Sequence, residues 1–117
     1  MISNKTQNRV KGFVGEKQAQ KYINRLGYKI LATNYTTKFG EIDIIAQDKS
    51  VIVFIEVKYR KSLKHGRPSE AVTPFKQNKI RGVAQFYLLQ NNLTQNYVRF
   101  DVLEIVDDEV NYVINAF

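Results

Sequence analysis

The spacing of hydrophobic and polar residues changes along this chain, and each spacing predicts one kind of element. Between residues 13 and 26 the apolar side chains fall at helical intervals, and Gly27 follows at a position where helices tend to end. Residues 28–36 are expected to form a first strand, Gly40 marks a turn, and residues 41–47 alternate in the manner of a second strand. The first part of the chain is therefore predicted to be a helix followed by a β-hairpin.

Residues 51–59 are the most continuously apolar segment. Their β-branched and aromatic side chains are typical of a central strand that is buried on both faces. Residues 61–72 are expected to form mainly a loop. Thr73 and Pro74 then make a good helix start, with Thr as the cap, and the helix is predicted to run to about Gln90.

Two further strands are predicted at residues 97–106 and 110–114. A strand, a helix and a strand in succession between residues 51 and 106 imply a parallel crossover. We therefore expect an α/β fold, with a mixed β-sheet flanked by helices and the order α-β-β-β-α-β-β. Residues 1–11 are polar and basic and are expected to form a flexible N-terminal arm, which leaves residues 12–117 as a single domain.

The composition excludes several classes of functional site and indicates where in the cell the protein lies. The chain of 117 residues has no cysteine, so disulfides, thiolate metal sites and thiol catalysis are excluded. The longest apolar run, residues 51–55, is too short to span a bilayer, and the N-terminus has no apolar segment of the signal-peptide kind. We expect a cytoplasmic protein that does not associate with a membrane.

The charge balance is strongly basic. Eighteen Lys and Arg against eleven Asp and Glu give a net charge of +7. Such a surplus favours a polyanionic partner, with nucleic acid as the first candidate and an anionic membrane surface as the second. On charge alone, a surplus that serves only solubility explains the composition equally well.

Three charged residues stand where the two central predicted strands come together. Glu56 and Lys58 are alternate residues, so they share one face of their strand at roughly 6–7 Å. Asp43 lies on the preceding strand, and pairing about a turn at residues 47–50 brings it opposite Glu56 to within two residues of register. An Asp and a Glu side by side repel each other unless a cation joins them.

This pair of carboxylates predicts a metal site. Asp43 and Glu56 offer the oxygen ligands that suit Mg²⁺ or Mn²⁺, and a bound metal polarises a phosphodiester and activates water. Lys58 would orient that water or offset charge in the transition state. Glu16 shares or borders the apolar face of the first helix and could complete the metal shell or act on the water. The alternative is a surface salt bridge between Glu56 and Lys58, with Asp43 solvated.

Four short motifs, in this order, also carry a resemblance. They are Gly15-Glu16, Gly40-Glu41-Ile42-Asp43, residues 54–60 (Phe-Ile-Glu-Val-Lys-Tyr-Arg) and Arg99-Phe100-Asp101-Val102. Together they resemble the YraN-like family of uncharacterised bacterial proteins, which in turn resembles the PD-(D/E)XK nucleases and the archaeal Holliday junction resolvases.

The resemblance implies a restriction-endonuclease-like core with Asp43, Glu56, Lys58 and Glu16 as catalytic residues. Ile42 stands where the superfamily name has proline. The implied activity is a metal-dependent endonuclease, for which DNA is a better candidate substrate than RNA and branched or junction DNA is one candidate structure. A homodimer is suggested only by analogy with resolvases. The alternatives are a nucleic-acid-binding protein that keeps the fold without cutting, and a structural or partner protein.

Several basic residues are candidates for holding the nucleic acid, and a solvated basic surface is the alternative for all of them. They are Arg60, Lys61, Lys64 and Arg67 after the motif lysine, and Lys76 and Lys79 in the first turns of the second helix.

We expect structural roles for the aromatic residues and for the remaining charged pair. Phe75 is expected on or near the apolar face of the second helix. Tyr28, Tyr35 and Phe39 are interpreted as core residues rather than as platforms for stacked bases. Asp101 and Arg99 share a strand face and are expected to form an ion pair.

Overall fold

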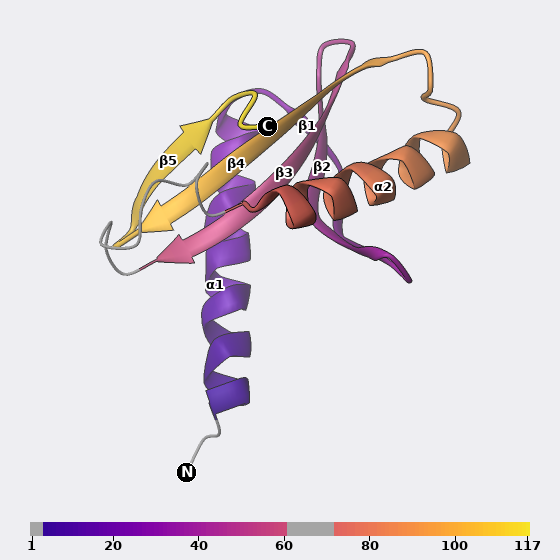
Figure 1. The fold of residues 1–117 in the computed structure, drawn as a ribbon. Helices are drawn as coiled ribbons and strands as arrows, with labels where there is room; N and C mark the ends of the chain where they lie inside the picture. Colours follow the sequence, from indigo (N-terminus) through magenta and orange to yellow (C-terminus); the bar gives the residue numbers. More distant parts are fainter. Residues whose placement is uncertain (1–3, 61–71) are drawn as a thin grey trace.

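The computed structural model describes residues 4–60 and 72–117, and the side chains of residues 15–60 and 72–117. Figure 1 shows the elements in chain order. They are α1 (Asn4–Arg25), β1 (Lys29–Thr37), β2 (Gly40–Asp48), β3 (Val51–Arg60), α2 (Pro74–Gln90), β4 (Tyr97–Val106) and β5 (Glu109–Val113). The predicted order α-β-β-β-α-β-β is confirmed. Neither helix is long and apolar enough to cross a membrane, as far as the described residues go.

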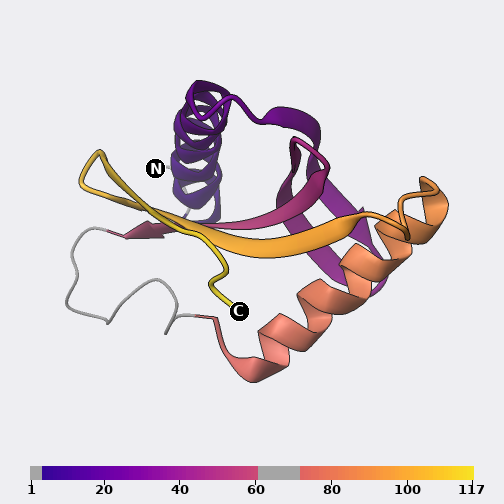
Figure 2. The same ribbon diagram turned by 90° about the horizontal axis from the view of Figure 1, so that it is seen from above.

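The strands form one five-stranded sheet in the order β1-β2-β3-β4-β5. Neighbours are antiparallel except β3 and β4, which run parallel because α2 connects them. Figure 2, seen from above, shows α1 on one face of the sheet and α2 on the other. The fold is thus the expected mixed sheet flanked by helices, consistent with a PD-(D/E)XK-like core.

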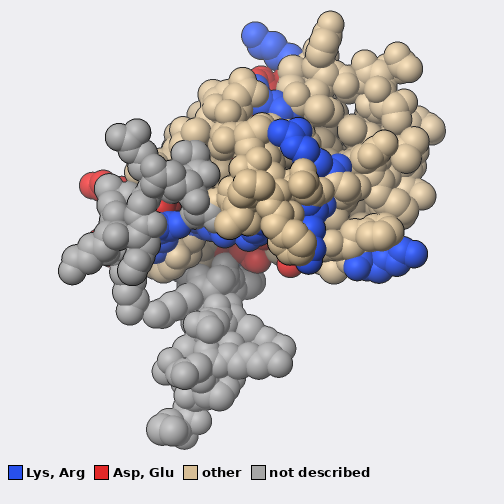
Figure 3. Space-filling view, viewed as in Figure 1, with Lys and Arg blue, Asp and Glu red and all other residues tan. Residues whose placement is uncertain are grey.

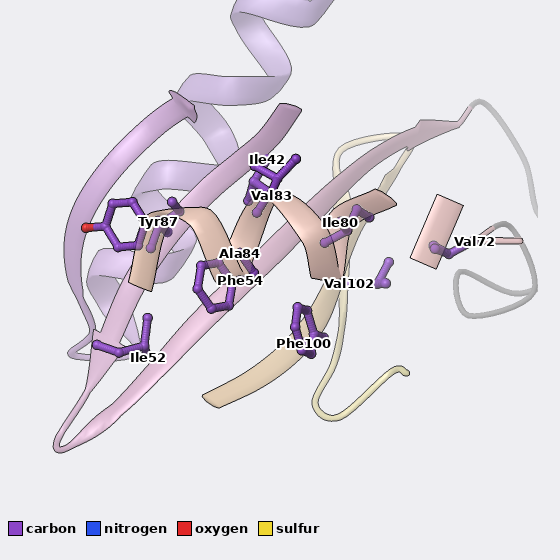
Figure 4. Packing of buried hydrophobic residues seen from close by; sticks show 11 residues of the cluster. Ile42, Ile52, Phe54, Val72, Ile80, Val83, Ala84, Tyr87, Phe100 and Val102 are labelled. Atoms are coloured by element: carbon purple, nitrogen blue, oxygen red, sulfur yellow. The ribbon is translucent and has the colours of Figure 1, made fainter. Parts of the chain in front are cut away.

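Each face of the sheet has its own hydrophobic cluster. Under α2, the aromatic rings of Phe54, Tyr87 and Phe100 pack with Ile80 and Val83 (Figure 4). Under α1 lie Ala19 and Ile23 of the helix and the other side chains of the central strands, among them Ile44, Val53 and Ile55. Strand β3 is buried on both faces, as its apolar sequence predicts, since Val53 and Ile55 face α1 while Ile52 and Phe54 face α2.

The first helix begins at Asn4, nine residues before the predicted start at Phe13. Residues 4–11 are therefore helical where an arm was expected. The prediction followed the apolar spacing, which begins at Phe13, but residues 4–11 contain no Gly or Pro to end a helix and include good helix formers such as Lys, Gln and Arg.

Two aromatic residues were wrongly expected in the core. Phe39, in the turn between β1 and β2, is 56% exposed, and Phe75, in the first turn of α2, is 71% exposed. The buried positions of α2 are Ile80, Val83, Ala84 and Tyr87. Phe75 belongs instead to the opposite side of the helix, which faces solvent.

Candidate functional site

The β2–β3 hairpin opens at Asp43. The two strands pair from Asp48 opposite Val51 to Ile44 opposite Ile55, around a tight turn at residues 49–50. The next positions along the strands are Asp43 and Glu56, so the predicted register holds. The turn is two residues shorter than expected, which removes the mismatch. Beyond Ile44, the Asp43 side chain bridges the strands, and its Oδ2 accepts a hydrogen bond of 2.8 Å from the Val57 N–H.

The surroundings of Asp43 favour its neutral form. Burial and the nearby Glu56 carboxylate raise the pKa of Asp43 to about 7, although the hydrogen bond from Val57 acts in the opposite direction. Glu41 and Lys76 exert smaller influences of opposite sign. A carboxyl group with its pKa raised by burial and a like charge is typical of functional sites.

Glu56 lies at the centre of the site with a lysine on each side. Only 7% of its side chain is exposed. The Lys76 Nζ lies 2.6 Å from Glu56 Oε1, and the Lys58 Nζ lies 3.6 Å from the same oxygen. The expected same-face pairing of Glu56 and Lys58 is therefore present, but Lys76 makes the shorter ion pair.

Lys76 reaches Glu56 because of where α2 begins. The side chain of Thr73 caps the helix by accepting from the Lys76 N–H at 3.2 Å, and Pro74 occupies the first turn. Lys76 was assigned only to phosphate binding from the sequence. The signal that could have placed it here is topological. A crossover helix begins near the carboxyl end of the strand it follows, where Glu56 and Lys58 lie.

The two lysines differ electrostatically. Burial, and then the neighbouring Lys76 ammonium, lower the pKa of Lys58. Burial also acts to lower the pKa of Lys76, but the Glu56 carboxylate and the neighbouring Lys58 and Asp43 together outweigh it, so the pKa of Lys76 is raised. Lys76 is thus the firmly charged partner of Glu56, while Lys58 is the lysine with the more readily removed proton.

Glu16 approaches Asp43 from the α1 side. It lines a small hollow of about 170 Å³ with Gly15, Asp43, Val57 and Tyr59. Gly15 permits this packing, because a Cβ there would lie only 3.2 Å from the Tyr59 ring. The Glu16 carboxylate accepts a hydrogen bond from Asn34 at 3.3 Å. Glu16 and Asp43 therefore border the same hollow, and the catalytic role of Glu16 stays a prediction.

The donor set fits a metal held by two carboxylates. Asp43 and Glu56 are adjacent, and the Lys76 ammonium already supplies one positive charge at the Glu56 oxygen. Mg²⁺ commonly binds through one or two carboxylates and keeps several waters. No group of three acidic or histidine side chains suited to a metal occurs within the described ranges 4–60 and 72–117. Glu16 therefore does not join Asp43 and Glu56 in such a group.

The residues predicted to hold nucleic acid are found in different settings. Lys79 is exposed, with its Nζ 4.8 Å from the centre of the Phe75 ring. Arg60 is turned inward, with its Nε 3.1 Å from the buried Glu104. Lys61, Lys64 and Arg67 lie outside the described residues, together with most of the predicted loop. Their binding role stays a prediction.

Arg99 and Asp101 form the expected ion pair, with Nε 3.0 Å from Oδ1. Asp101 is fully buried, and it also accepts hydrogen bonds from the Tyr112 hydroxyl and the Asn115 N–H. Arg99 further contacts the Tyr28 hydroxyl, so Tyr28 is part of this network. The network ties β4 to the C-terminal segment, which makes it structural.

Comparison with known proteins gives consistent matches. Residues 15–105 match the family described as "Uncharacterised protein family UPF0102", the YraN-like family. A UPF0102 protein of Clostridioides difficile (strain 630) is 46% identical over 112 residues, which cover 94% of this chain and 98% of the relative. One from Caldanaerobacter subterraneus subsp. tengcongensis is 45% identical over 120 residues, covering 97% and 98%. One from Clostridium botulinum (strain Hall) is 50% identical over 101 residues, covering 86% and 82%.

Proposed function

This chain belongs to the uncharacterised protein family UPF0102, and we propose that it is a metal-dependent endonuclease that hydrolyses phosphodiester bonds of DNA, with a preference for branched or otherwise irregular structures. The observation that supports this most strongly is the geometry around Glu56. A buried carboxylate, a second carboxylate on the adjacent strand and two lysines converge where β2 and β3 separate.

The proposal assigns a role to each side chain. Asp43 and Glu56 would hold Mg²⁺ or Mn²⁺, which when bound polarises a phosphodiester and lowers the pKa of a bound water. Lys58 lies on the Glu56 face and offsets the negative charge that develops on the phosphate during hydrolysis. Glu16, in the hollow beside Asp43, holds or deprotonates the attacking water from the α1 side.

Lys76 has two roles in this proposal. Without a metal, its ammonium neutralises the buried Glu56 carboxylate, which would otherwise be costly to bury. A metal held by Asp43 and Glu56 would compete with the Lys76 ammonium for the Glu56 oxygen, and the Lys76 side chain, which is 40% exposed, would have room to turn towards solvent. Its charge then becomes available to a phosphate of the bound strand.

One observation favours the second candidate, a nucleic-acid-binding protein that does not cut. The ion pair of 2.6 Å between Lys76 and Glu56 neutralises the site without a metal. If this pair persists when Mg²⁺ is present, the basic residues around it still bind phosphates, but nothing activates water. This candidate predicts salt-sensitive binding that survives Glu56→Ala.

Incubation of the purified protein with branched, single-stranded and duplex DNA, with Mg²⁺ or Mn²⁺, tests the proposal. We expect cleavage that EDTA stops and Asp43→Ala removes. Asp107→Asn, which changes an exposed carboxylate in the β4–β5 turn, is the matched control and should cut normally. Absence of cleavage on every substrate, or cleavage that Asp43→Ala retains, contradicts the proposal.

A further inference from the structure

The outer side of α2 carries a second row of apolar positions. Phe75, Phe86 and Leu89 are all exposed and recur at helical spacing, while Ile80, Val83 and Tyr87 face the sheet. Exposed apolar groups that form a contiguous surface commonly mark a binding site. The row is therefore a candidate contact surface for a binding partner.

A hollow lies between this side of α2 and the β1–β2 turn. It has a volume of about 610 Å³, within the range typical of ligand pockets. We call it the aromatic hollow, and its lining residues are Phe39, Phe75, Asn78, Lys79 and Gly82. Gly82 forms an open floor, because a Cβ built on it meets nothing within 4 Å.

The hollow combines aromatic rings with positive charge. Lys79 lies over the Phe75 ring at 4.8 Å, and Lys38 lies over the Phe39 ring at 5.2 Å. Phe39 also borders a neighbouring hollow of about 480 Å³ with Tyr35, Lys38 and Phe86. Among the described residues that line the two hollows, none is acidic. Figure 3 shows basic side chains spread over the face on which α2 lies, with acidic atoms at its margins.

We propose that the aromatic hollow binds an unpaired nucleobase of a nucleic-acid strand whose backbone passes the Glu56 site. Single-stranded nucleic acid is held by aromatic rings that stack on bases and by basic residues that follow the phosphates. Phe39 and Phe75 supply the rings, and Lys79 supplies the charge. The Asn78 amide offers both a donor and an acceptor to a base edge.

The position of the hollow connects it to the candidate active site. Lys76, whose ammonium contacts Glu56, and Lys79, which lines the hollow, are three residues apart on α2, a rise of roughly 4.5 Å. A strand with its phosphate at the site therefore has an adjacent base within reach of the hollow. The inference rests on the proposed function in that it takes nucleic acid as the ligand, and it extends it to substrates with unpaired nucleotides.

A second copy of this chain is the competing occupant. Two copies that met through this face would bring Lys38 and Lys79 of one against basic side chains of the other, and like charges across an interface are unfavourable. The net charge of +7 adds to that repulsion. A polyanion meets the same surface with complementary charge, which is why we assign the hollow to a nucleic-acid strand.

Fluorescence anisotropy in EDTA tests the proposal without any cleavage. The probes are a labelled single-stranded DNA, the same strand with abasic sites in place of its bases, and the corresponding duplex. The wild-type protein should bind the strand with bases more tightly than the abasic strand. Phe75→Ala should weaken binding of the base-containing strand about five- to hundredfold and leave the abasic strand nearly unchanged.

Gly82→Leu separates a filled hollow from a damaged fold. Leu is a better helix former than Gly, and its side chain enters open space, so stability should hold or rise while the preference for bases is lost. Tyr97→Ala removes an aromatic ring that is 80% exposed on β4, away from the hollow, and should change nothing. Only the proposal predicts that Gly82→Leu keeps its stability and loses its preference for bases.

Equal affinity of the wild type for the two single strands, or unchanged binding by Phe75→Ala and Gly82→Leu, would overturn the proposal. So would a dimer in sedimentation that Gly82→Leu dissociates without affecting base preference, because the hollow would then belong to a second copy. A protein that prefers bases but cuts no DNA would contradict the proposed nuclease and leave this inference standing. A protein that cuts DNA but shows no base preference would contradict this inference and leave the proposed nuclease standing.

Discussion

Replacement of Asp43 by Asn should stabilise the metal-free protein at neutral and alkaline pH. Folding raises the pKa of Asp43 from 3.8 to about 7, through burial and the adjacent Glu56 carboxylate. Between these values the folded protein binds a proton that the unfolded chain releases. The free energy of unfolding must therefore fall as the pH rises from about 4 to about 7.

The size of this change in the free energy of unfolding follows from the shift in the pKa of Asp43. A displacement of about 3 pK units corresponds to about 4 kcal/mol at most, because each unit is worth about 1.36 kcal/mol. Asp43 is only half-buried, and solvent screening reduces this figure, so we expect about 1–4 kcal/mol. Asn removes the charge, while its carbonyl oxygen can still accept from the Val57 N–H.

Urea unfolding followed by circular dichroism measures the free energy of unfolding of both proteins, at several pH values with and without Mg²⁺. Asp43→Asn and the wild type should be similarly stable near pH 4, and the variant should be the more stable one near pH 8. Saturating Mg²⁺ should stabilise the wild type, by about 2.7 kcal/mol at a hundred times its dissociation constant, and leave the variant unchanged. Asp107→Asn is the control with the same chemical change at an exposed turn. Parallel pH curves for wild type and Asp43→Asn would refute the reasoning.

Three further changes test other parts of the structure. Lys76→Met should destabilise the metal-free protein by about 1–3 kcal/mol, because Glu56 loses its 2.6 Å partner. The same change should tighten Mg²⁺ binding in isothermal calorimetry, because Lys76 no longer competes with the metal for Glu56. Weaker binding would contradict this competition. Thr73→Ala should cost about 0.5–2 kcal/mol in urea unfolding through loss of the α2 cap, with Thr73→Ser close to wild type. Asp101→Ala should lower the free energy of unfolding by about 3–5 kcal/mol, because it leaves the Arg99 charge in a half-buried network; a loss below 1 kcal/mol would mean that the network is not structural.

Most of the fold could be predicted because its signals are local. The apolar run of β3 and the Thr73-Pro74 helix start each place an element within one or two residues of its observed bounds, and the predicted strand at residues 97–106 coincides with β4. The start of α1 could not be placed, since residues 4–11 are polar and have no periodic signal. The exposed aromatic residues Phe39 and Phe75 could not be recognised, because a Phe looks the same in sequence whether it faces a core or a partner.

The candidate site could also be predicted only as far as local sequence patterns reach. The pairing of Glu56 and Lys58 follows from strand parity alone, and Asp43 joins them through a hairpin register that was uncertain by two residues. Lys76 was placed on the correct helix turn, but its ion pair with Glu56 was not predicted, and its phosphate-binding role stays a prediction. Its approach to Glu56 depends on how α2 sits on the sheet, and that arrangement comes from the packing of Ile80, Val83 and their neighbours rather than from any local pattern.

The central claim is that Asp43 and Glu56 together hold a divalent metal. A crystal structure of the protein soaked in Mn²⁺, with anomalous diffraction data, tests it most directly. We predict a manganese peak that both carboxylates contact, with the Lys76 ammonium displaced from the Glu56 oxygen that it now contacts at 2.6 Å. A structure with no manganese at these carboxylates, and with Lys76 still bound to Glu56, would contradict the claim.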